Sequence, residues 1–228
     1  NSDGEIWVRK RRMLQPVFQS SRFQMLDGIV QDATTRAANR WQGGAIDAAA
    51  EMTHIALEVA ARAFFGTDLG HEQQQIREAV TVLAEAFSRR YSSTFAAIAG
   101  ATGLSFLSNR SASHAKQTLY NVVDRIVADQ GVHGDSQSLA SVLFEASDPQ
   151  TGQRFSRSEL QAEVLTLLIA GHETTAAALA WTWQLLAWHP EAQQRLRDEV
   201  TGILGNDPAS MARLAELPYL RMVLDEAL

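Results

Sequence analysis

One stretch of this 228-residue sequence combines reactive side chains with residues that weaken a helix. Gly171-His172-Glu173-Thr174-Thr175 lies inside a long apolar run, Val164 to Trp188. Glycine costs about 1 kcal/mol relative to alanine inside a helix, and a glutamate in apolar surroundings needs a partner or a raised pKa. Because local violations of this kind concentrate at functional sites, this stretch is the first candidate for chemistry.

Helical spacing places Ala170, Glu173, Thr174 and Ala177 or Ala178 on one stripe. All are small except the acid, so a large flat ligand could lie against the backbone beside one carboxylate and one hydroxyl. The Thr174 hydroxyl can donate back to the carbonyl of Ala170, which would loosen the helix and open a niche. The other interpretation is close helix packing through small residues, with Glu173 in a salt bridge elsewhere. The stripe alone leaves both open.

Composition excludes several classes of protein. Without cysteine, the 228 residues form no disulfide, no thiolate metal site, no cysteine nucleophile and no covalent c-type haem attachment. A zinc protease is excluded because His172-Glu173 is followed by alanine, not a second histidine, at position 176. The net charge of -6 gives no overall attraction to nucleic acid. The 46% hydrophobic and 20% charged residues are typical of a globular protein.

The elements that position these residues are predicted to be helices only, so the fold class is all-α. All five prolines fall at or beside a predicted helix end, and no segment shows sustained two-residue alternation. Apolar positions with three- and four-residue spacing predict helices at Phe23 to Trp41, Ile46 to Phe65, Ile76 to Phe87, Leu119 to Val127, Leu139 to Phe144, Phe155 to Trp188, Gln193 to Leu204 and Leu217 to Leu228.

The helix that carries the stripe is predicted to be very long. Ser156 and Glu159 form a capping-box pattern, and nothing stops the helix until Pro190. Residues 157–188 would span roughly 48 Å. The apolar part, Val164 to Trp188, predicts a helix that is buried on all sides or spans a membrane. We favour burial, because a glutamate at the centre of a membrane span would cost about 2.5–3.5 kcal/mol.

Two connections are also predicted. Tyr91 to Ser108 is apolar but carries Gly100 and Gly103, so it is either a long connection of the kind that forms lids or a poorly patterned helix. The five residues from Asp148 to Gly152 are predicted to form a turn.

The candidate stretch resembles the distal signature of the cytochrome P-450 family of haem-thiolate monooxygenases. Ala170-Gly171-His172-Glu173-Thr174-Thr175 matches that signature, and other segments match the family's pattern from its C helix to the start of its K helix. These are Gly4, Trp7, Arg11, Pro16 and Phe18, then His189-Pro190-Glu191, Gln194 to Val200, Leu217 to Leu220 and Val223 to Leu228. The resemblance implies one P-450-like domain over residues 1–228, incomplete at both ends, with a very long central helix.

The resemblance also implies roles for single residues. Trp7 and Arg11 would bind a haem propionate, and Ala170 and Gly171 would lie against the haem. Glu173 and Thr174 resemble the acid–alcohol pair that delivers protons to dioxygen, and Thr174 would also contact the cofactor. His172 and Thr175, on other faces, are expected to pack or to form hydrogen bonds. Glu226 would be the acid of the family's Glu-x-x-Arg structural motif.

The implied activity is insertion of one oxygen atom from dioxygen into a small hydrophobic substrate. It requires haem b and an electron-transfer partner, a ferredoxin or a flavoprotein reductase. None of these residues is expected to ligate the metal, because the family's axial cysteine is absent, so we expect a partial sequence that is inactive alone. Arg9, Lys10 and Arg12 are candidates to dock the electron-transfer partner, and a solvated helix face is the other interpretation.

A function of another class also remains open. An all-helical ligand-binding or regulatory module without catalysis could use Glu173 and Thr174 to hold a polar group of its ligand. No nucleic-acid partner is expected. A soluble, bacterial-type protein of the cytoplasm is expected, with a membrane anchor upstream left open.

Overall fold

The computed structural model describes residues 4–18, 26–41, 43–65, 74–76, 78–83, 105–133, 138–205 and 207–228. Within these ranges the chain is helical and forms no strand; Ser147 and Arg154 make one isolated bridge. The all-α prediction is therefore confirmed. The elements are α1 (Gly4–Leu14), η1 (Gln15–Phe18), α2 (Leu26–Arg40), α3 (Ala48–Phe65), α6 (Ser105–His133), α7 (Leu139–Glu145), α8 (Arg157–Trp188), α9 (Pro190–Leu204), η3 (Met211–Glu216) and α10 (Pro218–Ala227).

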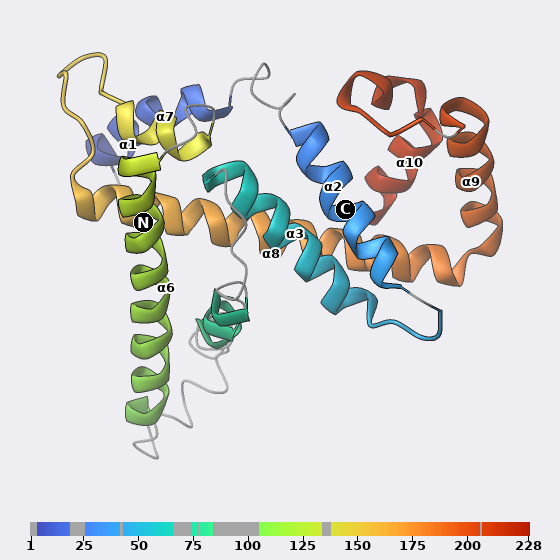
Figure 1. The fold of residues 1–228 in the computed structure, drawn as a ribbon, viewed down its shortest axis with the longest axis horizontal. Helices are drawn as coiled ribbons and strands as arrows, with labels where there is room; N and C mark the ends of the chain where they lie inside the picture. Colours follow the sequence, from blue (N-terminus) through green and yellow to red (C-terminus); the bar gives the residue numbers. More distant parts are fainter. Residues whose placement is uncertain are drawn as a thin grey trace.

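Helix α8 is the axis of the structure. Figure 1 shows it running the length of the molecule, with α1 and α7 at one end, α2 and α3 over the middle, and α9 and α10 at the other end. Its 32 residues match the predicted helix, and both halves of the predicted capping box between Ser156 and Glu159 are present. Pro190 is the first residue of α9, so the predicted stop is also confirmed.

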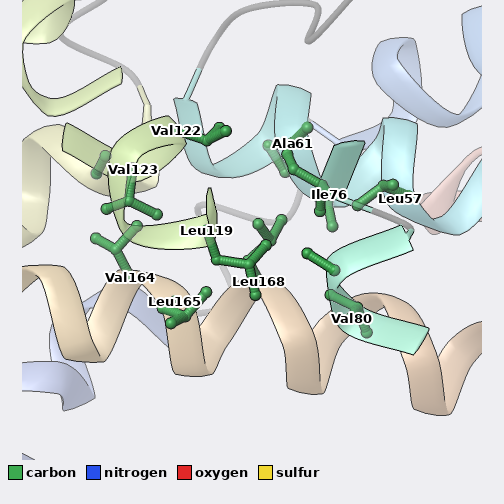
Figure 2. Close-up of a cluster of buried hydrophobic side chains, with 14 of the residues drawn as sticks. Leu57, Ala61, Ile76, Val80, Leu119, Val122, Val123, Val164, Leu165 and Leu168 are labelled. Carbon is green, nitrogen blue, oxygen red and sulfur yellow. The ribbon is translucent and has the colours of Figure 1, made fainter. Parts of the chain in front are cut away.

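The main core lies where α3 and α6 pack against α8. Figure 2 shows Leu119 and Val123 of α6 turned toward Val164, Leu165 and Leu168 of α8, with Val122 on the side of α3. The cluster also takes buried residues from α3, from α7 and from the short helical stretch around Ile76. A second, smaller cluster joins α2 to α3; its members are Ala33, Ala37, Met52 and Ile55.

The expectation that α8 is buried on all sides is wrong for the described chain. The buried side chains of α8 lie largely along one side, at Leu160, Val164, Leu165, Leu168, His172, Ala176, Thr182 and Leu186. On the opposite side Ala170 and Ala177 are exposed, and so are Trp181 and Trp188, at 58% and 63%. Apolar composition alone does not say which side of a helix has a partner, and the described elements cover only one. Within the described residues, α8 is also the one helix long and apolar enough to cross a membrane, a test that core helices pass too.

The two predicted connections have different outcomes. Helix α6 begins at Ser105, so residues 105–108 are helical, whereas 91–104 lie outside the described residues. The turn is confirmed: the Gly152 N–H donates to the carbonyl of Asp148 at 2.8 Å, and Gly152 has φ of 70°. This turn leads the chain into α8.

Candidate functional site

One face of α1 carries an aromatic ring and a cation side by side. Trp7 and Arg11 are one helical turn apart, and the guanidinium carbon of Arg11 lies 5.2 Å from the centroid of the Trp7 ring. Both side chains are exposed, Trp7 by 47%. They line a hollow of about 970 Å³ between α1, η1 and α8, together with Gly4, Lys10, Leu14, Gln15, Phe18, Ala162, Glu163 and Thr166.

The predicted stripe of α8 continues from the wall of this hollow. Thr166 lines the hollow, Ala170 follows one turn later and Thr174 two turns later, and all three are exposed. Glu173 is exposed on the same side, and among the described residues it forms no ion pair. The structure therefore places Trp7 and Arg11 at one end of an open face of α8, and Ala170, Glu173 and Thr174 further along it.

The hydroxyls of the stretch are engaged by the helix itself. The Thr174 Oγ1 donates to the carbonyl of Ala170 at 2.6 Å, as predicted, and the Thr175 Oγ1 donates to the carbonyl of Gly171 at 2.7 Å. The helix remains continuous from Arg157 to Trp188, as predicted. In this geometry the lone pairs of both hydroxyl oxygens remain available to accept a hydrogen bond.

The neighbouring residues have structural contacts. His172 is buried, 2% exposed, and its Nδ1 lies 2.9 Å from the carbonyl oxygen of Leu168, which confirms the expected packing and hydrogen-bonding role. Gly171 lies beside α3: a Cβ added there would stand 3.8 Å from a ring carbon of Phe64, an ordinary contact. No close approach in the described chain therefore requires glycine at this position.

Three of the four consecutive basic residues of α1 are paired with acids. Arg9 bonds to Glu159, Lys10 Nζ lies 2.8 Å from Glu163, and Arg12 reaches Asp148 through two nitrogens at 3.1 and 3.3 Å. These side chains are partly buried, so a simple solvated face does not describe them. Their role in docking a partner stays a prediction, and a partner would compete with these intramolecular carboxylates.

Two of the acids have lowered pKa values. The hydrogen bond from Arg12 holds the pKa of buried Asp148 below its usual value, with help from the Thr151 hydroxyl, against the opposing effect of burial. The backbone N–H of Ser156 lowers the pKa of Glu159, and Arg9 adds to this effect. Both carboxylates are therefore ionised anchors for the cations of α1.

Glu226 lies far from the first hollow. It lines a smaller one of about 320 Å³ between α8, α9 and α10, in the company of Thr182, His189 and Tyr219. The start of α10 is held by Glu199 of α9, whose carboxylate accepts from the N–H groups of Tyr219 and Leu220 at 2.7 and 2.8 Å. Glu199 therefore replaces a local capping side chain, which Leu217 does not supply.

The sequence did not reveal the roles of the acids that hold these helices. Glu159 was recognised only as a cap, and Glu163, Asp148 and Glu199 were not recognised. Glu159 and Glu163 are four residues apart, as are many acid pairs on solvated helices, and their partners lie about 150 residues away. The signal in the sequence is the excess of basic residues in α1, because cations that become partly buried require acids from another element.

Comparisons with known proteins show the family of the chain. The cytochrome P450 family model matches residues 1–228. Cyclooctatin synthase of Streptomyces melanosporofaciens is 33% identical over 224 residues, which cover 96% of this chain and 48% of the relative. Cyclooctat-9-en-7-ol 5-monooxygenase of the same organism is 33% identical over 229 residues, covering 100% of this chain and 50% of the relative.

Structural similarity points the same way. The crystal structure of the cytochrome P450DA heme domain superposes with a TM-score of 0.83 at 25% identity, covering 100% of this chain and 50% of that chain. The chain thus spans about half the length of the relatives it matches. Because the family model matches the whole chain, the chain belongs to the cytochrome P450 family.

Proposed function

We propose that the whole protein is a monooxygenase that inserts one atom of dioxygen into a small, hydrophobic organic substrate, with haem b as its cofactor. The observation that carries the proposal is the open face of α8, with Trp7 and Arg11 at one end and Glu173 and Thr174 further along. One of the relatives is by name a monooxygenase that acts on cyclooctat-9-en-7-ol. We further propose that the 228 residues are part of a single P450 domain.

The described residues fit the proposed cofactor. Arg11 forms no ion pair with any carboxylate of the described residues, and its guanidinium lies beside the Trp7 ring on the wall of the hollow. A guanidinium and an indole N–H suit the carboxylates of a haem. The small side chain of Ala170 would let a flat ring approach the backbone of α8. These 228 residues contain no cysteine, so none of them would supply a thiolate to the haem iron.

When bound, haem supplies the redox chemistry with dioxygen. The residues of this chain position the cofactor and move protons. Glu173 is exposed, so its carboxylate can exchange a proton with solvent. Thr174 Oγ1 can accept a hydrogen bond from a water, and it must turn away from the carbonyl of Ala170 before it can donate its own proton.

Partners and location are also proposals. Electrons would come from a ferredoxin or a flavoprotein reductase, and a relative in Bacillus subtilis, 24% identical, is by name a bifunctional cytochrome P450/NADPH–P450 reductase. We place the protein in the cytoplasm as a soluble enzyme.

Titration with haem b and with its dimethyl ester tests the cofactor site. If Arg11 binds a propionate, Arg11→Gln should bind haem b at least about fivefold more weakly and bind the ester unchanged. The control is Arg221→Gln, which removes an exposed arginine of α10 that bonds only to Asp225 among the described residues. Equal affinity of the unmodified chain for haem b and the ester would contradict the site and favour a non-catalytic binding module.

A further inference from the structure

Helix α1 separates its cations between two faces. Arg9 and Arg12 lie on the face that also carries buried Met13, and they bond to acids at and before the start of α8. Lys10 and Arg11 line the hollow. The orientation of α1 around its own axis therefore brings two adjacent cations to the wall of the proposed cofactor site.

The same wall carries one acid. Glu163 of α8 lines the hollow, and its carboxylate is 2.8 Å from Lys10 Nζ. Both side chains are largely buried, with 17% and 15% exposed for lysine and glutamate. Removal of one member of such a pair leaves a charge that is poorly solvated and seeks another partner. For Glu163, the other cation on this wall is Arg11.

We infer that Lys10 is a positioning residue: its ammonium pairs with Glu163 and so leaves the guanidinium of Arg11 free for an anionic ligand in the hollow. The inference rests on the proposed function, in which that anion is a haem carboxylate. Three acids neutralise three of the four cations of α1, and Arg11 is the one that pairs with no carboxylate of the described residues. Without Lys10, Glu163 would pair with Arg11 and compete with the ligand.

The test compares Lys10→Gln, Glu163→Gln and the double variant by titration with haem b and its dimethyl ester. Lys10→Gln should bind haem b about five- to tenfold more weakly, because Glu163 then occupies Arg11. Glu163→Gln should bind at least as tightly as the unmodified chain, and the double variant should recover to within about twofold of it. Binding of the ester should not change in any variant.

Rescue in the double variant separates this role from a merely structural one. If Lys10–Glu163 acted only by holding α1 against α8, the double variant would bind as weakly as Lys10→Gln, and that result would overturn the inference. Weaker binding by Glu163→Gln would overturn it as well, and this variant keeps the test decisive when Lys10→Gln does not fold.

A second measurement needs no cofactor. A double-mutant cycle between Arg11→Gln and Glu163→Gln, measured by urea unfolding, should show no coupling when Lys10 is present. In the Lys10→Gln background it should show about a two- to fivefold effect on the unfolding equilibrium constant. If the coupling is absent in the Lys10→Gln background, the role of Lys10 is overturned. If the coupling is present but Arg11→Gln does not change haem binding, the cofactor site is overturned instead.

Discussion

The side chain of Thr174 offers a test that separates stability from chemistry. Thr174→Ala removes an exposed hydroxyl whose proton is already donated within the helix, at 2.6 Å to the carbonyl of Ala170. Alanine is the better helix former by about 0.5 kcal/mol, and hydrogen bonds of this kind slightly destabilise a helix. For a chain of this size the melting temperature should therefore rise by about 1–2 °C.

Thr175→Ala is a closely matched control. Thr175 is also exposed, and its hydroxyl makes the same bond, at 2.7 Å to the carbonyl of Gly171. The two variants should therefore gain the same stability. They should differ in chemistry, because the two side chains point about 100° apart around the helix, and Thr174 lies on the side that also carries Ala170.

The chemical consequence is measured in the whole protein as product formed per nicotinamide cofactor oxidised, with hydrogen peroxide quantified in parallel. A positioned proton-transfer group contributes about 10²–10⁴-fold, and water partly replaces a lost hydroxyl. Thr174→Ala should therefore lower product yield by about tenfold, with a matching rise in peroxide. Equal product yields in Thr174→Ala and the unmodified enzyme, or a larger loss of yield in Thr175→Ala, would refute the proton-transfer role of Thr174 and favour a packing role for the stripe.

Three further outcomes follow from the described contacts. Ser156→Ala removes the first half of the capping box and should cost about 1 kcal/mol, a fall of about 2–4 °C in melting temperature, whereas Ser210→Ala, at a helix start without a side-chain cap bond, should change little. Leu168→Ala empties a site that is 1% exposed and should lower the free energy of unfolding in urea by about 2–5 kcal/mol; a loss below about 1 kcal/mol would contradict the core packing. Asp148→Asn should unfold more easily at neutral pH. Since the pKa of Asp148 is lowered in the folded state, its stabilisation is present above the unfolded pKa and is lost as pH falls through the folded one. The free energy of unfolding of Asp148→Asn should approach that of the unmodified chain below about pH 4. The control Asp225→Asn changes an exposed carboxylate, and its free energy of unfolding should stay close to that of the unmodified chain at every pH measured.

Local signals explain what was predictable in the fold. The two ends of α8 were predicted to the residue, because a capping box and a proline act within one turn of the positions they fix. The back-bond of Thr174 was predictable for the same reason, since its partner lies four residues away. Where patterning was weak, as around Ser105, the boundary was not predicted, and α6 begins well before the segment that periodicity indicated.

Long-range contacts explain what was missed. The composition of Val164 to Trp188 is apolar all round, but exposure depends on which sides of α8 have a neighbour, and that is a property of the tertiary fold. The ion pairs of the α1 cations were not predicted, because the acids that form them are far away in the sequence. Only the fold brings Lys10 to Glu163 and Arg12 to Asp148.

The shared carboxylate of Glu159 has a consequence for recombining this chain with its relatives. One oxygen caps α8 through the Ser156 N–H, and the other bonds to Arg9 of α1. This carboxylate and the two neighbouring ion pairs connect α1 to residues 148–163, although more than a hundred residues separate the two segments. Both segments must therefore come from the same parent for the ion pairs to form. A chimera with a crossover between them would inherit cations from one parent and acids from the other. By contrast, α9 and α10 are joined through Glu199 within a short stretch of chain, so they can be exchanged together as one cassette.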